Sequence, residues 1–394
     1  MSKNPIQVYV PPRPAPTGFR RARTAALAGL ALLMGLALLA GLALLAGCQG
    51  GAGGTDLGRD GAVGRLTRDL QRLPTVVSVD PWPAPSPPRG REPTGLAIST
   101  AHYQLYTTSA DPLLLRRLPV FLEAAFQAYS GWVTPDVNLP ADRKLAVYFF
   151  SSRPEWEAFT DQWAQEQAPV YRRIHAGAYY LRGVIVAYQL TRQGSFSVLG
   201  HEGWHQFSDA LFAWRLPAWL DEGLATQFEA YRWQAGRVEF QPALNAGRLH
   251  ALAQGLADGR LLPLAELLTL DAGRVLSHAG ADSENGADPQ VLSYYAQVYA
   301  LLRFLREYRY GSYAPAVQRL VTDGYRGQWP LDQGERDEAS RTTDNPSRRW
   351  NARVGLRLFH EYLGDPAALD LAYQEFCARL LAGVHFRGGG PSGP

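Results

Sequence analysis

Two histidines four residues apart, His201 and His205, enclose the pentapeptide His-Glu-Gly-Trp-His near the middle of the chain. On an α-helix their side chains lie about 40° apart around the axis and one turn apart along it, so both imidazoles reach one metal ion. Glu202 projects to the same side of such a helix, near the metal but not forced onto it. The opposite arc carries Trp204 and Phe207, which need burial. The spacing therefore predicts an amphipathic helix that presents two imidazoles to a metal.

A third ligand is required, because two imidazoles do not make a durable zinc site and the fourth position of a catalytic site is left for water. Glu222 is the best candidate. Sixteen residues separate it from His205, and it lies in the segment Pro-Ala-Trp-Leu-Asp-Glu-Gly-Leu-Ala at 217–225. Pro217 suits the first turn of a new helix, which places Glu222 one short connection after the histidines. The alternative is an ordinary acidic side chain that complements the positive end of that helix.

An H-E-x-x-H helix followed by a helix with W-L-x-E-G-x-A is similar to the gluzincin metallopeptidases, in particular the aminopeptidase N-type enzymes and the peptidase MA-like group. The resemblance implies a Zn2+ ion bound by His201, His205 and Glu222, and a peptide or protein substrate. It also implies that Glu202 is the general base. The G-x-M-x-N signature of the exopeptidases is missing from the corresponding residues 183–188. Aminopeptidase specificity therefore does not transfer, and the choice between endopeptidase and exopeptidase stays open.

A third motif, Tyr-Ala-Gln-Val-Tyr-Ala-Leu-Leu, begins at Tyr295. It resembles the Y-E-K-G-F-A-L-L-type helix of the aminopeptidases, whose first tyrosine stabilises the oxyanion, and so implies this role for Tyr295. Gln297 and Val298 stand where that motif has Lys and Gly. The neighbouring Tyr294 is the alternative donor. Tyr295, Val298 and Leu302 also form an ordinary core stripe at helical spacing, which is the competing interpretation.

Two further carboxylates lie close to the motifs. Asp209 falls one turn beyond His205, where it could accept a hydrogen bond from a ligand imidazole and fix its tautomer. The alternative is a solvated carboxylate at the end of the helix. Asp221, which precedes Glu222, is open to the same two interpretations.

The first 47 residues predict export. Basic residues precede an uncharged run of Ala, Leu and Gly that ends in Leu-Ala-Gly-Cys at Cys48. This order keeps the N-terminus inside and directs the downstream residues outward. The run resembles the lipobox of bacterial lipoproteins, which implies a signal peptide over residues 1–47 and lipidation of Cys48. An uncleaved transmembrane anchor is the alternative, because the run is long. In both cases the rest of the chain is expected at the periplasmic or extracellular face of an envelope membrane.

The remainder predicts an α+β protein with a small mixed sheet. Residues 48–95 are expected to be a flexible Gly/Pro-rich linker. Residues 96–386 are expected to form the catalytic domain, with an α/β part to about residue 192 and a mostly helical part after it. Residues 387–394 are expected to be a disordered tail.

The elements within this domain follow from hydrophobic periodicity and turn residues. Strands are expected at 102–107, 144–150, 176–181 and 184–190, and helices at 112–132, 154–165, 196–212, 217–233, 243–257, 293–309, 313–323 and 350–381. The polar segments 277–289 and 324–348 are expected to be loops. The strand at 184–190 is expected to lie at a sheet edge, where an extended peptide substrate pairs with it.

The charge and the cysteine content argue against a nucleic-acid-binding protein, a disulfide-rich fold and a Cys-based zinc site. The formal net charge is +3, but five cations and no Asp or Glu precede position 48, so the rest of the chain is slightly acidic. A nucleic-acid groove needs a basic excess, and no nucleic-acid partner is expected. Two cysteines, Cys48 and Cys377, provide no disulfide framework and no Cys-based zinc site.

These features predict an exported, lipid-anchored zinc metallopeptidase that hydrolyses peptide bonds. Two other classes stay open. One is a catalytically inactive zinc lipoprotein that binds or supports other molecules, although Glu202 would then have no function to preserve it. The other is a zinc hydrolase of a non-peptide amide or ester. The sequence does not specify a cleavage preference or an oligomeric state.

Overall fold

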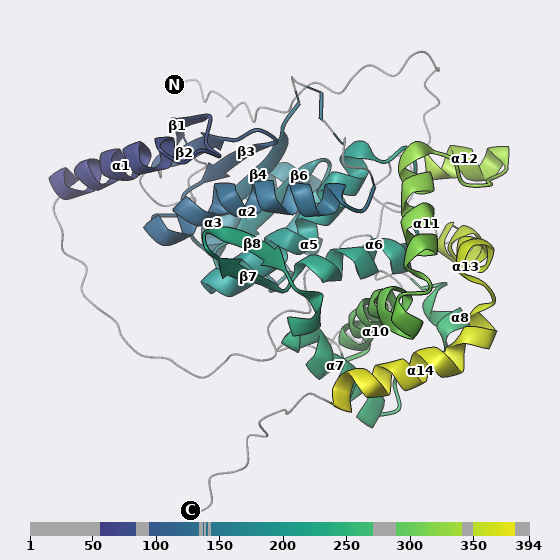
Figure 1. Cartoon of the computed structure of the whole chain (residues 1–394). Helices are drawn as coiled ribbons and strands as arrows, with labels where there is room; N and C mark the ends of the chain where they lie inside the picture. The colour runs from purple at the N-terminus through teal and green to yellow at the C-terminus, as the bar shows by residue number, and fades with distance from the viewer. Residues whose placement is uncertain are drawn as a thin grey trace, which may run out of the picture.

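The computed structural model describes residues 56–83, 94–133, 137, 139–140, 143–270, 289–340 and 350–382. These residues form an α+β fold with a six-stranded mixed sheet, a separate two-stranded hairpin and a helical C-terminal half (Figure 1). The predicted fold class is confirmed.

The main sheet has three parallel strands at its centre. Its strands are β1 (Ser78–Pro83), β2 (Thr94–Ser99), β3 (Tyr103–Thr107), β4 (Leu145–Phe150), β5 (Ala178–Leu181) and β6 (Val184–Tyr188). They lie in the order β1-β2-β3-β4-β6-β5, in which β3, β4 and β6 are parallel and the other neighbours are antiparallel. Along β4, Val147 and Phe149 enter one hydrophobic core and Tyr148 and Phe150 the other. The central strand is therefore covered on both faces, as its apolar sequence requires.

The folded chain begins earlier than predicted. Helix α1 (Asp56–Gln71) and β1 lie within the segment expected to be a flexible linker, and β1 pairs with β2 along its whole length. The linker prediction is wrong for these two elements. Pro81 and Pro83 lack the N–H group that a central strand donates, but β1 is the outermost strand and pairs on one side only.

The helices surround the sheet and build the C-terminal half. Those of the N-terminal part are α2 (Pro112–Ser130), α3 (Arg153–Ala164), η1 (Gln165–Gln167) and α4 (Ala168–Tyr171). Those around the candidate site are α5 (Arg192–Leu211), α6 (Ala218–Ala225), η2 (Thr226–Phe228), η3 (Pro242–Leu244), α7 (Ala246–Ala257), α8 (Leu264–Leu267) and α10 (Pro289–Glu307). The C-terminal helices are η4 (Tyr308–Tyr310), α11 (Ala314–Arg326), α12 (Gln333–Ala339), η5 (Trp350–Gly355), α13 (Leu356–Leu363) and α14 (Pro366–Ala382).

Three of the predicted elements differ from the structure. The helix expected over 217–233 ends early, and the hairpin of β7 (Tyr231–Gln234) and β8 (Arg237–Phe240) follows it. Its two turn residues have positive φ (48° and 79°), which suits a tight hairpin turn. The helix expected over 350–381 is interrupted at Gly364 (φ 102°), after which Pro366 begins α14. The expected loop 324–348 contains α12.

Helix α5, which carries the His-Glu-Gly-Trp-His motif, is not amphipathic. All of its residues from Ser195 to Ser208 are buried, because α2, the sheet and α6 cover it from different sides. A Cβ atom at Gly200 would lie 2.2 Å from the Phe228 carbonyl oxygen, and one at Gly203 would lie 2.5 Å from the Tyr129 hydroxyl. Glycine at these two positions therefore allows close packing around the helix.

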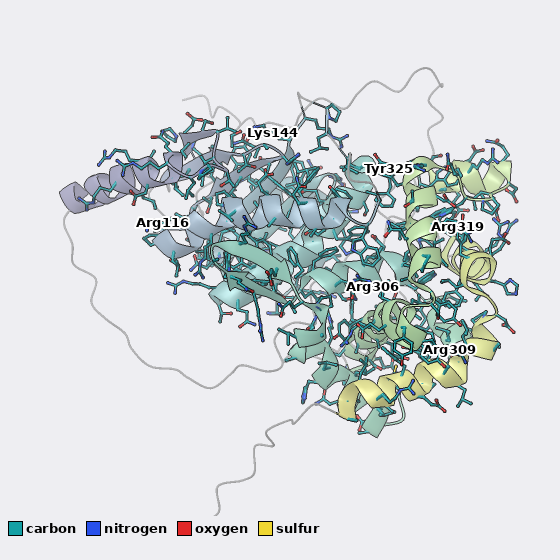
Figure 2. All side chains as sticks on the ribbon, viewed as in Figure 1. Arg116, Lys144, Arg306, Arg309, Arg319 and Tyr325 are labelled. Atoms are coloured by element: carbon teal, nitrogen blue, oxygen red, sulfur yellow. The ribbon has the colours of Figure 1, made fainter. Side chains whose placement is uncertain are left out.

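Cationic side chains are spread over both halves of the molecule. Figure 2 labels Arg116 on α2 and Lys144 next to β4 in the N-terminal half, and Arg306 and Arg319 on α10 and α11 in the helical half. The guanidinium of Arg319 lies 5.3 Å from the ring centroid of Tyr362. Such stacking lets an arginine cover apolar surface while it keeps its charge.

Candidate metal centre

The three predicted metal ligands converge on one point. His201 and His205 lie one turn apart on α5, and Glu222 comes from α6, which packs against it. All three side chains are buried, with at most 3% of each residue exposed. The two Nε2 atoms are 3.3 Å apart, and Glu222 Oε2 lies 3.4 Å from Nε2 of His201 and 3.5 Å from Nε2 of His205. This group of side chains could hold a metal ion.

Two carboxylates fix the orientation of the imidazoles. Glu229 Oε1 lies 2.8 Å from Nδ1 of His201, and Asp221 Oδ2 lies 3.0 Å from Nδ1 of His205. An ionised carboxylate can only accept a hydrogen bond, so each Nδ1 carries the proton. In the neutral imidazoles, both Nε2 atoms then have a lone pair directed at the point where the ligands meet. The Nε1–H of Trp204 donates to Asp221 Oδ1 over 2.8 Å and holds this carboxylate in place.

The electrostatics of the cluster favour a cation. Burial lowers the pKa of His201, but Glu222 and Glu229 outweigh it and raise the value to about 9. Burial also lowers the pKa of His205, while Asp221 and Glu222 raise it well above its ordinary value. Burial raises the pKa of Glu222, but the two histidines bring it down to about 2. The buried Glu222 carboxylate, with Nε2 of each histidine within 3.5 Å, thus attracts positive charge: protons on the imidazoles, or a metal ion that displaces these protons.

Glu202 lies beside this cluster without belonging to it. It is 1% exposed, and its Oε2 has no hydrogen-bond partner among the residues that the structure describes. Burial raises its pKa to about 7, against the opposing effect of His201 and His205. The backbone N–H of Tyr180 on β5 donates to its carboxylate. A carboxylate with this pKa exchanges protons near neutral pH, as a general base must.

Strand β5 is therefore the sheet edge that borders the site. The prediction that residues 184–190 form this edge is wrong, because β6 pairs with β4 on one side and with β5 on the other. The strand 184–190 is strongly apolar, which is typical of an interior strand rather than an edge.

Tyr295 enters the site from α10. Its ring centroid lies 6.1 Å from that of His201, edge to face, and the residue is 1% exposed. Its hydroxyl has no hydrogen-bond partner within the described part of the chain. Burial and the charge of Glu222 raise its pKa well above the ordinary value, so the phenol stays protonated and can donate. Tyr294 packs against Tyr295 with 5.5 Å between ring centroids.

Glu229 and Arg248 support the centre but were not predicted from the sequence. Glu229 follows Glu222 by seven residues, a spacing that two helical turns would bring to one face, but a 3-10 turn intervenes. Arg248 is buried on α7 and forms an ion pair with Glu229, which keeps the pKa of that carboxylate at about 2 against the effect of burial. No local pattern marks a pair nineteen residues apart.

The structure also separates the roles of Asp209 and Asp221. Asp209 is exposed and accepts a hydrogen bond from the Tyr180 hydroxyl rather than from an imidazole. Asp221 is the carboxylate that contacts His205.

If this group binds a metal, replacing Asp221 by asparagine is expected to weaken metal binding by about 10–100-fold, the usual cost of losing a carboxylate that orients a ligand histidine. Competition with a chromophoric chelator measures the effect. Asp209→Asn is the matched control, since it removes a carboxylate one turn beyond His205 that contacts no imidazole. Equal affinities in the two variants would exclude this role for Asp221.

No family model matches the chain, and neither a curated protein nor a solved structure is found to match it.

Proposed function

We propose that this protein is a zinc-dependent metallopeptidase, exported and held at an envelope membrane by a lipid on Cys48. Cys48 lies outside the described residues, and none of the described helices is long and apolar enough to span a membrane. The anchor therefore rests on the sequence. The catalytic assignment rests on the buried centre around His201, His205 and Glu222.

The single observation that carries the proposal is the triangle of ligand atoms. Its edges are 3.3, 3.4 and 3.5 Å. Tetrahedral zinc with bonds of about 2.0–2.1 Å requires neighbouring ligand atoms about 3.3–3.4 Å apart. Two imidazoles and one carboxylate are also a donor set that catalytic zinc sites use. The distances between the ligand atoms and the types of donor therefore both support zinc as the bound ion.

Zinc, when bound, supplies Lewis acidity toward a carbonyl oxygen and an acidified water. The chain supplies the rest. Glu202, ionised above about pH 7, accepts the proton of the attacking water and returns it to the leaving amine. Tyr295 keeps its proton and donates a hydrogen bond to the developing oxyanion. The edge of β5 beside Glu202 provides backbone groups for an extended peptide.

A digest of a broad peptide library with the purified, zinc-loaded protein tests this function. We expect cleavage that stops when a chelator removes zinc and returns when zinc is restored. Stoichiometric zinc without cleavage of any peptide would contradict the peptidase assignment. A parallel set of ester and non-peptide amide substrates then separates a different hydrolase from an inactive binding protein.

Tyr295→Phe is expected to lower kcat by about 10²–10³-fold, the usual effect of losing one oxyanion donor, with little change in KM or zinc content. Steady-state kinetics on one cleaved peptide measures it. Tyr299→Phe is the control: Tyr299 lies one turn further along α10, and its hydroxyl donates to the Pro242 carbonyl, outside the centre. Tyr294→Phe distinguishes the neighbouring candidate. A large loss there, with none in Tyr295→Phe, would assign the donor to Tyr294.

A further inference from the structure

Arg248 is a buried cation in the first turn of α7, with 3% of the residue exposed. Its Nε lies 2.8 Å from Glu229 Oε2, and its Nη2 lies 2.5 Å from Glu229 Oε1. The guanidinium thus donates to both oxygens of one carboxylate, which fixes the orientation of the carboxylate plane as well as its position. Asn245, the N-cap of α7, donates to the same Oε2 over 2.7 Å.

Glu229 links this arginine to the metal centre. The Oε1 atom that accepts from Arg248 also accepts from Nδ1 of His201 over 2.8 Å. Guanidinium, carboxylate and imidazole therefore form one chain of hydrogen bonds that ends at a predicted metal ligand. A displacement of Arg248 changes the orientation of that imidazole.

The same guanidinium packs on Tyr295. The Arg248 Cζ atom lies 4.9 Å from the centroid of the Tyr295 ring, a cation–π contact. The remaining nitrogen, Nη1, has no hydrogen-bond partner among the described residues. Glu229 and the Tyr295 ring are therefore the contacts that set where the guanidinium lies.

We infer that Arg248 is a positioning residue that orients two functional groups at once: the ligand His201, through Glu229, and the oxyanion donor Tyr295, through its ring. The second half of this inference rests on the proposed peptidase function, and the first half does not. A single planar cation links the two because it offers an edge to the carboxylate and a face to the phenol ring.

Arg248→Lys tests the first half, because lysine keeps the charge but cannot form the two parallel hydrogen bonds. We expect the zinc affinity, measured by chelator competition, to fall by about 10–100-fold. Arg303→Lys is the matched control. Arg303 also pairs with both oxygens of a glutamate, Glu307, and lies 5.8 Å from the Tyr299 ring centroid, but it contacts no metal ligand. Unchanged zinc affinity in Arg248→Lys, or an equal loss in Arg303→Lys, would overturn the inference.

A double-variant cycle separates positioning from general damage to the fold. If Arg248 acts through Glu229, Arg248→Lys lowers the zinc affinity much less in a Glu229→Gln background than in the wild type. Equal losses in both backgrounds would refute that path. If Arg248→Lys is unstable, the double variant Glu229→Gln/Arg248→Met, which removes both charges, is used in its place. Its zinc affinity should equal that of the single variant Glu229→Gln.

The second half is tested at saturating zinc. Arg248→Lys is expected to lower kcat in the wild type but to have little further effect in a Tyr295→Phe background. The same fold-loss in both backgrounds would exclude a role in positioning Tyr295. A crystal structure of Arg248→Lys provides a readout that needs no activity: an unmoved Tyr295 ring would exclude this role, and a displaced ring supports it. The zinc-affinity measurements also test the first half of the inference if the protein cleaves no peptide.

Discussion

Replacing Glu202 by glutamine is expected to lower peptide hydrolysis by at least about 10²–10⁴-fold, the usual contribution of a general base, while zinc content stays near one ion per chain. Glutamine keeps the size of the side chain but cannot accept the proton. Cleavage of a library-derived peptide and metal analysis of the same sample measure the two quantities. Full activity in Glu202→Gln would exclude the proposed mechanism even if zinc binds tightly.

The thermal stability of the zinc-free Glu202→Gln variant should also differ from that of the zinc-free wild type in a pH-dependent way. Burial raises the pKa of Glu202 from its ordinary value of 4.5 to about 7. The folded state therefore holds this proton more tightly than the unfolded state. The contribution of Glu202 to the free energy of unfolding is fully present below pH 4.5 and is lost as the pH rises through 7. We expect the zinc-free Glu202→Gln protein to gain in Tm relative to zinc-free wild type above pH 7, and to show little gain below pH 4.5.

Removing a ligand is expected to have the largest effect on metal content. In His205→Ala or Glu222→Ala, the dialysed protein should lose most of its zinc, because two remaining ligands do not make a durable site. Mass spectrometry of metals gives the ratio of zinc to protein. His250→Ala is the control, since His250 is exposed and lies outside the cluster. Stoichiometric zinc in Glu222→Ala would remove this residue from the site.

Zinc should also stabilise the wild type but not the ligand variants. A metal that binds only the folded chain raises Tm with its free concentration. The gain should grow as the pH rises, because zinc replaces the protons that His201 and His205, whose pKa values are raised, hold beside the buried Glu222.

The sequence predicted the local parts of the centre well. The helix expected at 196–212 contains the observed pair of histidines on α5, and the short connection to Glu222 is as expected. Both follow from spacing along one or two helices, where the period of 3.6 residues relates sequence to direction. Tyr295 also lies on its predicted helix, beside His201.

The contacts that support the centre were not predictable in the same way. Arg248 reaches Glu229 from a separate helix after a hairpin, and only tertiary packing brings them together. The apolar sequence of β6 is typical of an interior strand, but which strand lies outside it at the edge depends on the order of strands, which no strand's own residues specify. The N-terminal strand was missed because its prolines are compatible with an outermost strand alone.

The early start of the fold bears on the proposed lipid anchor. With lipid on Cys48, only eight peptide steps separate the anchor from Asp56, the first residue of α1. Fully extended, they span at most about 29 Å, far less than the spacer of nearly fifty residues that the Pro- and Gly-rich sequence had indicated. The molecule would then work in a thin layer next to the bilayer. Segments of membrane proteins close to the surface would meet the site at high local concentration, whereas soluble proteins of the compartment would have to diffuse into this layer to be cleaved.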